Sequence, residues 1–224
     1  AKERASGTYL SVLGFGRGNN LGISHALARG ARHVFLLNQD AYVLPSTLAE
    51  LTAFMDAHPD LGVVSPLHCS PDPDHTDPRT LRGYLQRYAL PYLADACQGR
   101  CEPYYLTRGV NAAAWFVRSD VWRRFGGFDP LFFMYAEDDD LLSRWAYHGV
   151  HFALLPSSRV VHLRESVQGP RVGWWGQVLR RARRQRAELL HGMKQPGFSL
   201  LHTLSVLLAD GLLSPLAFFV VRRD

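Results

Sequence analysis

The sequence contains few cysteines, three in 224 residues. Cys69, Cys97 and Cys101 are too few, and odd in number, for a disulfide framework, and no Cys or His pair at zinc-site spacing accompanies Cys97 and Cys101. No signal peptide is visible. These absences exclude a disulfide-rich secreted domain and a structural zinc module. We therefore expect reduced thiols and a cytoplasmic location.

The sequence also has no internal repeat, and its composition is that of a globular protein. It is 47% hydrophobic, 12% aromatic and 20% charged, which excludes a disordered chain and allows a sizeable core. The net charge of +5 comes largely from arginines within residues 180–186. Because aromatic side chains are not interleaved with these arginines as stacking platforms, we expect no nucleic-acid partner.

The first part of the chain alternates between predicted strands and helices. Residues 9–13 are predicted to form a strand that leads into a glycine-rich segment and a helix, which ends at Gly30. Residues 33–37 and 61–65 are continuous apolar runs, typical of strands covered on both faces. Between them, Thr47 and Glu50 have capping-box spacing at the start of a helix. This order predicts an α/β fold with a mostly parallel sheet flanked by helices.

The second part continues this pattern and then changes in character. Elements are predicted at residues 110–117 (strand), 120–125 (helical turn), 137–147 (helix), 150–155 and 159–162 (strands), while 84–105 fits no clear pattern. Residues 174–193 form a predicted basic amphipathic helix, and 198–221 are mostly apolar but interrupted by Asp210. We expect a catalytic domain at 1–170 and a helical extension at 171–224. A peripheral membrane contact through 174–221 competes with simple packing of the helix on the domain.

Two separate positions carry side chains suited to a divalent metal. Asp40 follows the predicted strand 33–37, at the strand end where open α/β sheets bind their ligands. His162 closes the short apolar strand 159–162, and a neutral imidazole can join a carboxylate on a metal. Asp40 can equally be a turn residue, and His162 can be a structural residue of the core.

Four consecutive acids, residues 137–140, begin a predicted helix. The helix dipole favours negative charge there, which is a sufficient structural explanation. However, Asp138 precedes Leu141 and Leu142 by three and four residues, so it is expected to point inward with them. An inward carboxylate next to an apolar segment suits a general base.

The glycine-rich segment has a rival interpretation. Gly14 and Gly16, between a strand and a helix, partly match the dinucleotide-binding fingerprint of an NAD(P)-dependent oxidoreductase. The last position of the fingerprint is Asn19, and Asp40 lies further on than the usual ribose-binding acid. This alternative explains neither the acid cluster nor His162.

Taken together, four segments resemble the family 2 glycosyltransferases, and most closely bacterial rhamnosyltransferase-like enzymes of surface-polysaccharide synthesis. They are residues 14–23 (GFGRGNNLGI), 36–40 (LLNQD), 126–141 (GGFDPLFFMYAEDDDL) and 160–162 (VVH). The resemblance spans about residues 12 to 165 in the order of the family. It implies a GT-A fold, a Rossmann-like sheet, and transfer of a sugar from a nucleotide-diphosphate sugar to a glycan or lipid-linked acceptor.

The resemblance also implies roles for particular residues. Asn38 and Asp40 occupy the metal-binding DxD position, with Asn38 replacing the first acid, and His162 completes a site for Mg²⁺ or Mn²⁺. Asp138 matches the catalytic base of an inverting reaction. The residues that match the donor-binding loop are Arg17, Asn19 and Asn20, and the acceptor-side candidates are Gly109, Asn111, Trp115 and Glu137.

One part of the family pattern is missing. These enzymes usually begin with a strand, a helix and a second strand that hold the nucleotide base, whereas this sequence starts at about the third strand. We therefore expect an amino-terminally incomplete catalytic domain. From the basic helix and the apolar segment that follows it, we expect a location at the inner face of the plasma membrane. A degenerate, non-catalytic relative that acts as a binding module is the alternative.

Overall fold

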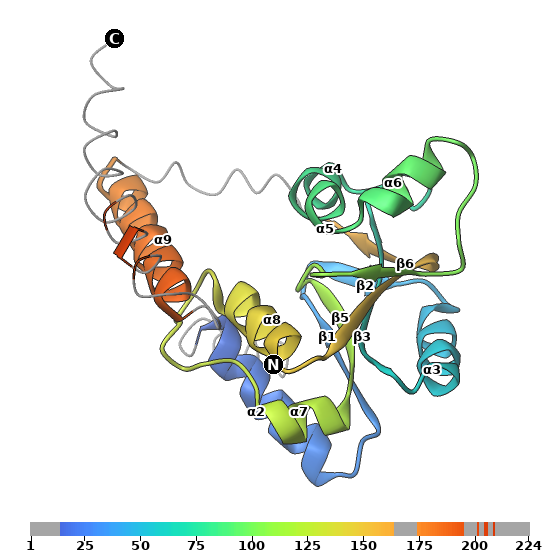
Figure 1. The fold of residues 1–224 in the computed structure, drawn as a ribbon, viewed down its shortest axis with the longest axis horizontal. Helices are drawn as coiled ribbons and strands as arrows, with labels where there is room; N and C mark the ends of the chain where they lie inside the picture. The colour runs from blue at the N-terminus through green and yellow to red at the C-terminus, as the bar shows by residue number, and fades with distance from the viewer. Residues whose placement is uncertain (1–13, 164–173, 195–200, 202–203, 206–207, 209–224) are drawn as a thin grey trace, which may run out of the picture. The chain divides into compact units, whose positions relative to one another are not determined.

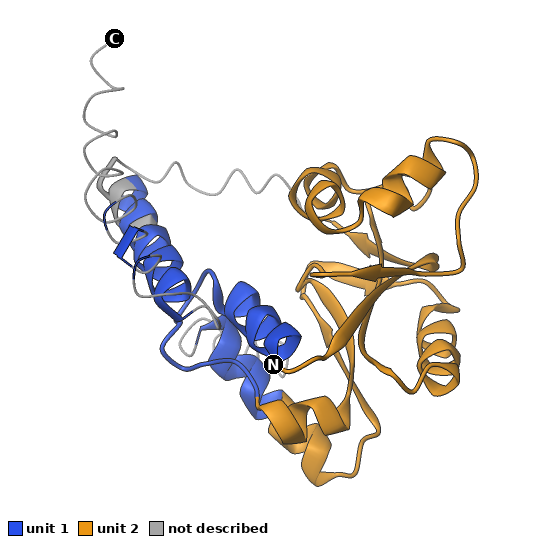
Figure 2. Ribbon diagram, viewed as in Figure 1, with its two compact units in different colours: residues 1–22, 127–147, 168–224 blue, residues 23–126, 148–167 orange. Residues whose placement is uncertain are grey.

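The computed structural model describes residues 14–163 and 174–194, with a few further residues up to 208. The predicted strand at 9–13 and most of the apolar segment 198–221 lie outside the described residues. The chain divides into two compact units, which are coloured separately in Figure 2. Unit 1 comprises residues 1–22, 127–147 and 168–224, and unit 2 comprises residues 23–126 and 148–167.

Unit 2 is built around a single mixed sheet (Figure 1). Its described strands follow the order β1-β5-β3-β6-β2, and β4 also pairs with β6. All nine residues of the central strand β3 are buried, so the sequence 61–69 forms the middle of the core. The strands are β1 (His33–Leu37), β2 (Ala41–Val43), β3 (Leu61–Cys69), β4 (Tyr105–Thr107), β5 (Ala114–Arg118) and β6 (His151–His162).

Most neighbouring strands are antiparallel, which corrects the expectation of a mostly parallel sheet. Among the described strands, β3 and β6 form the one parallel pair, and the other four pairings are antiparallel. The prediction rested on the order β1, α3 (Thr47–Ala57), β3. These two strands do run in the same direction, but β5 lies between them and is antiparallel to both. The α/β class itself, a sheet flanked by helices, is confirmed.

Two apolar clusters pack on the strands of unit 2. In the first, Leu51 and Met55 of α3 contact Val64 and Phe116. In the second, Leu85 and Tyr92, from a run of short helical segments, contact strand residues that include Leu67 and Leu154. The remaining helical segments of the unit are α4 (Pro78–Thr80), the π-helical turn η1 (Leu81–Leu85), α5 (Gln86–Tyr88), α6 (Leu90–Ala96) and α7 (Ser119–Phe125).

Several local expectations need correction. Residues 150–155 and 159–162, expected as two strands, form the single strand β6, which carries a register shift between Leu155 and Arg159. β1 is not covered on both faces, because buried Val34 and Leu36 alternate with more exposed residues. The capping box is also absent: Thr47 is itself helical and its hydroxyl donates to the carbonyl of Arg159 instead.

Unit 1 contains the start of α2 (Phe15–Ala28), together with α8 (Glu137–Tyr147) and α9 (Trp174–Lys194). The predicted bounds of α8 are confirmed. By contrast, the glycine-rich segment, expected as a loop, already forms the first turns of α2. Close packing explains why glycine stands there, since a Cβ at Gly16 would lie 2.8 Å from the Cβ of Phe128.

α9 packs within unit 1 through one narrow face. Ala187 is 5% exposed, and the Lys194 ammonium lies 2.5 Å from the Asp129 carboxylate and 3.0 Å from that of Asp140. Met193, the last residue of the predicted amphipathic helix, is half exposed. No helix in the described part of the chain is long and apolar enough to cross a membrane. The expected boundary at residue 170 stays a prediction.

Candidate active site

Asp40 and His162, far apart in the sequence, form a close pair in unit 2. The Asp40 Oδ1 and His162 Nε2 atoms are 3.2 Å apart. The sheet positions them: Ala41 opposes His162 in the β2–β6 ladder, and the Leu163 N–H donates to the Asp40 carbonyl at 2.8 Å. The His162 side chain is 6% exposed and that of Asp40 is 48% exposed. The pair therefore presents an accessible carboxylate that is backed by a buried imidazole.

A second buried histidine, His68 on β3, lies beside this pair. Its ring centroid is 6.2 Å from that of His162, and its Nε2 is 3.3 Å from the Ser65 hydroxyl oxygen. His68 is not among the predicted site residues, because its strand was predicted to end at residue 65. The available signal was the continuation of the apolar run through Leu67 and Cys69, which would have placed His68 inside a buried strand.

The Asp40–His162 pair offers part of a metal-binding set. Carboxylate oxygen and imidazole nitrogen both suit a divalent cation of the first transition row, and Mg²⁺ commonly takes one or two carboxylates plus phosphate oxygens. No group of three His, Cys, Asp or Glu side chains arranged for a metal occurs among the residues that the structure describes. The residues present therefore fit a metal that is held by two protein donors and by the diphosphate of a ligand.

In unit 1, the turn before α8 holds unusual backbone conformations. Tyr135 and Ala136 have φ angles of 73° and 60°, in the left-handed region that non-glycine residues rarely adopt. Such conformations cost of order 1–3 kcal/mol each and cluster at functional sites. The strained turn fixes the direction in which Glu137 and Asp138, the first residues of α8, leave the backbone.

Glu137 is the acid that this turn buries. Glu137 is 6% exposed, and its Oε2 atom has no hydrogen-bond partner among the described residues. Burial raises the pKa of Glu137 to about 7, and the charges of Asp138 and Asp139 add to the rise. Glu137 therefore exchanges its proton near neutral pH, as general acids and bases do.

The expectation that Asp138 points inward with the leucines is only partly met. Asp138 and Asp139 are half-buried, whereas the buried acids of α8 are Glu137 and Asp140. Asp140 is neutralised within unit 1, since its carboxylate lies 3.0 Å from Arg144 and 3.0 Å from Lys194. Spacing alone did not distinguish these positions, because three of the four acids lie three or four residues before an apolar side chain.

The three predicted donor-loop residues are engaged inside unit 1. Asn20 donates to the Phe128 carbonyl at 2.8 Å and accepts from the Phe128 N–H at 2.9 Å. Arg17 donates to the Pro130 carbonyl at 3.0 Å, and Asn19 to the Phe15 carbonyl at 3.0 Å. The segment therefore ties α2 to residues 128–130. Because Gly16 lies within the helix, the segment also lacks the open phosphate-binding turn that a dinucleotide fingerprint requires.

The acceptor-side candidates of unit 2 lie in its interior. Trp115 is 0% exposed on β5, so it packs in the core and has no face for a sugar, which corrects that expectation. Asn111 is 7% exposed, donates to the Thr80 hydroxyl and accepts from the Ala113 N–H. Gly109 is buried against the ring of Tyr88. Asn111 and Gly109 thus shape the fold around a small cavity.

Asn38 lies at the turn that carries Asp40. Its N–H donates to the Ala113 carbonyl at 2.9 Å, and its carbonyl accepts from the Ala41 N–H at 3.0 Å. These backbone bonds close the turn between β1 and β2. The structure thus gives Asn38 a backbone role next to the Asp40 carboxylate.

No protein-family model matches the sequence, and no curated protein matches it. The fold, in contrast, resembles solved glycosyltransferases. The structure described as GalNAc-T7 with UDP, GalNAc and Mn²⁺ matches with a TM-score of 0.50 and 16% sequence identity, over 67% of this chain and 30% of that chain. The mannosyltransferase PcManGT from Pyrobaculum calidifontis, in complex with GDP-Man and Mn²⁺, matches with a TM-score of 0.49 and 20% identity, over 88% of this chain and 50% of that chain.

The chain thus spans 30% and 50% of the lengths of these two proteins. At such low identity, the likeness to the GalNAc-T7 structure is a likeness of fold. It confirms the fold class expected from the sequence, an α/β sheet of the GT-A type with flanking helices.

Proposed function

We propose that this chain carries the sugar-transfer chemistry of an inverting glycosyltransferase that uses a nucleotide-diphosphate sugar. The single observation that supports this most is the Asp40–His162 pair, whose atoms lie 3.2 Å apart where β2 begins beside the end of β6, on a sheet of the GT-A type. The family 2 resemblance of the sequence adds its support, as does the strained, acid-rich start of α8.

In this proposal, Asp40 and His162 are the residues that would hold Mg²⁺ or Mn²⁺ at the diphosphate of the donor. The bound cation would neutralise the charge that develops on the departing nucleoside diphosphate. The half-exposed Asp40 carboxylate faces the ligand, while the buried His162 ring keeps its orientation through packing. Asn38, Arg17, Asn19 and Asn20 remain the candidates for donor contacts.

Asp138 is the proposed general base. It removes the proton from an acceptor hydroxyl, whose oxygen then forms a bond to the anomeric carbon of the donor sugar. The bond from that carbon to the diphosphate oxygen breaks, and the diphosphate leaves with the electron pair. One displacement of this kind inverts the anomeric carbon and needs no enzyme nucleophile. Glu137, which is still an acceptor-side candidate, would carry a proton near neutral pH.

The finer assignments also belong to this proposal. The resemblance of residues 126–141 points to a family 2, rhamnosyltransferase-like enzyme of bacterial surface-polysaccharide synthesis, with a glycan or lipid-linked acceptor. The exposed arginines of α9 support peripheral contact with the inner face of the plasma membrane, since basic residues are attracted to anionic lipid.

A thermal-shift experiment tests the donor site. The unfolding midpoint is measured with UDP, dTDP and GDP, each with and without Mn²⁺, because ligands that bind the native state raise it by mass action. We expect one nucleotide to raise the midpoint only with Mn²⁺, and Asp40→Ala to abolish that shift. Asp60→Ala, which removes another exposed acid of unit 2, is the matched control and should keep it.

The outcomes separate the candidate functions. If no nucleotide shifts the midpoint, or if Asp60→Ala removes the shift as Asp40→Ala does, the assignment of the donor site is wrong. A metal-dependent shift without any sugar transfer would instead indicate the non-catalytic binding relative.

A further inference from the structure

Unit 1 contains a pocket that the proposed reaction does not use. It has a volume of ≈ 270 Å³ and lies between the segment that precedes α8 and one face of α9. Its walls are mainly apolar, with two cations at one side. The lining residues that matter for its chemistry are Leu131, Phe133, Met134, Leu190, Arg183 and Arg186.

Both walls of the pocket are fixed in place. Ala187, in the middle of the α9 wall, is 5% exposed. About two helical turns further along α9, the Lys194 ammonium lies 2.5 Å from the Asp129 carboxylate and 3.0 Å from the Asp140 carboxylate. These ion pairs hold α9 against the opposite wall. The pocket is therefore part of the folded unit and not an accident of one surface loop.

The apolar wall is exposed to an unusual degree. Leu131 is 51% exposed, Phe133 48% and Met134 45%, and the three are nearly consecutive in the sequence. Clustered apolar side chains on a surface mark interaction sites, whereas scattered ones need no explanation. This wall is therefore suited to hydrocarbon.

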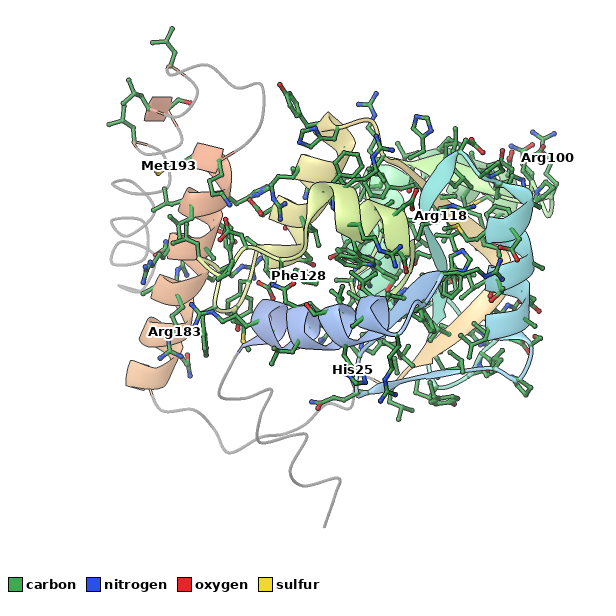
Figure 3. All side chains as sticks on the ribbon, turned by 90° about the horizontal axis from the view of Figure 1, so that it is seen from below. His25, Arg100, Arg118, Phe128, Arg183 and Met193 are labelled. Atoms are coloured by element: carbon green, nitrogen blue, oxygen red, sulfur yellow. The ribbon has the colours of Figure 1, made fainter. Side chains whose placement is uncertain are left out.

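The cations of the pocket are available for a ligand. Arg183 and Arg186 are three residues apart on α9, so their side chains are neighbours, and both are exposed. Neither has an ion-pair or hydrogen-bond partner among the described residues. Arg184 lies between them in sequence and differs, because it pairs with Glu188 at 2.8 Å. None of the described residues that line the pocket is an acid. Figure 3 labels Arg183 on α9.

We propose that this pocket binds a lipid phosphate, a single phosphate group joined to a hydrocarbon chain. Guanidinium groups bind phosphate oxygens in a bidentate manner, and the phosphate carries about −1.5 to −2 charges at neutral pH. Arg183 and Arg186 bind the phosphate, and the first carbons of the chain lie against Leu131, Phe133 and Met134. Its volume of ≈ 270 Å³ lies just below the range of pockets that enclose a whole drug-sized ligand. It therefore takes the phosphate and the start of the chain, and the remainder extends outward.

The position of the pocket gives the lipid a place in the proposed reaction. Met134, on the apolar wall, precedes the strained turn by one residue and the proposed base Asp138 by four. A sugar joined to the bound phosphate, which is then a diester with one negative charge, would be the acceptor, with the lipid as its carrier. This last step rests on the proposed glycosyl transfer, whereas binding of the lipid phosphate does not.

Binding is tested with the full chain and farnesyl phosphate as the probe, by titration calorimetry. We expect farnesol, which lacks the phosphate, and inorganic phosphate, which lacks the chain, to bind at least tenfold more weakly. The double variant Arg183→Ala/Arg186→Ala should weaken farnesyl phosphate binding by tenfold or more. Arg184→Ala is the matched control and should bind as the natural chain does. Because all three arginines are exposed, an unchanged thermal midpoint checks that the variants fold.

Three results would overturn the inference. The first is an equal loss of affinity in Arg184→Ala, which would indicate general attraction between charges. The second concerns phosphatidylcholine vesicles that contain either phosphatidylglycerol or the same fraction of farnesyl phosphate. Equally strong binding to both kinds of vesicle would indicate a membrane-surface contact. The third is binding only after removal of residues 195–224, which would indicate that the chain itself fills the pocket.

The nucleotide experiment keeps the two proposals apart. Loss of lipid binding with an intact metal-dependent nucleotide shift would refute the lipid site and leave glycosyl transfer standing. Lipid binding without any nucleotide shift would refute the donor site and leave the lipid site standing.

Discussion

Replacing Glu137 with glutamine should raise the free energy of unfolding relative to the natural chain, and this gain should be larger at alkaline pH than at acidic pH. Glutamine resembles the protonated carboxyl group in shape and lacks a charge. In the natural chain, burial raises the pKa of Glu137 from 4.5 to about 7. Folding therefore favours the protonated form, and ionisation of this group in the folded state costs stability.

The magnitude follows from the linkage between protonation and folding. Below pH 4.5 the group is protonated in both states, and the pKa shift costs nothing. As the pH rises from 4.5 through about 7, the unfolded chain ionises first, so the free energy of unfolding falls. With ~1.4 kcal/mol for each pKa unit, the full cost is about 3 kcal/mol above neutral pH. Between about pH 5.5 and about pH 8.5 the cost grows by about 2 kcal/mol.

The assay is urea unfolding of the natural chain and of Glu137→Gln at these two pH values, followed by tryptophan fluorescence. Trp145, fully buried on α8, reports on the helix that carries Glu137. We expect the variant's free energy of unfolding, relative to the natural chain, to be about 2 kcal/mol higher at the alkaline pH than at the acidic pH. Glu102→Gln, which changes an exposed acid, should show no such difference. An equal effect of Glu137→Gln at both pH values would refute the argument that burial holds a proton on this group.

Three further substitutions test contacts inside one unit or the other by urea unfolding. Gly14→Ala should lower the free energy of unfolding by about 3 kcal/mol, because Gly14 has a φ of 76° and an added Cβ would overlap the Phe133 carbonyl oxygen; a neutral effect would contradict that contact. Asn20→Ala should cost about 2 kcal/mol, since it removes both hydrogen bonds to Phe128, and Asn20→Asp should also destabilise, since a carboxylate oxygen would then face the Phe128 carbonyl oxygen. Arg118→Met should cost about 3 kcal/mol, because the guanidinium donates to three main-chain carbonyls at the ends of α3 and β3; a loss under 1 kcal/mol would show that water replaces it.

Much of the fold could be predicted from local patterns. The apolar run that became β1 and the acidic, then apolar, pattern of α8 gave correct elements, because burial and helical periodicity leave direct marks in the sequence. The direction of the strands could not be read in this way. It depends on β5, which follows both β1 and β3 in the sequence but inserts between them in the sheet, and strand order is a property of the whole chain.

The site was predictable in its residue types and less so in its geometry. Asp40 and His162 were identified from strand ends and family resemblance, and the structure brings them to 3.2 Å. Which of the acids at the start of α8 is buried depends on the left-handed turn at Tyr135 and Ala136. The sequence does not predict this turn, because neither position is a glycine, the residue that usually adopts a positive φ. The engagement of Asn20 with Phe128 was equally hidden, because it joins segments far apart in sequence.

The pairing of β2 with the end of β6 also bears on how the protein assembles. The two proposed metal ligands, Asp40 and His162, are separated by most of the sheet's sequence, so they meet only after the chain has closed a very long loop. Contacts of such high sequence separation form slowly. A ligand that bridges the two side chains would therefore stabilise the pairing of β2 with β6, which is the pairing of the sheet expected to form last. In a chain that lacks residues beyond 160, the Asp40 turn would have no His162 beside it. If the proposed metal site is correct, the affinity of that chain for Mn²⁺ would be lower than the affinity of the full chain.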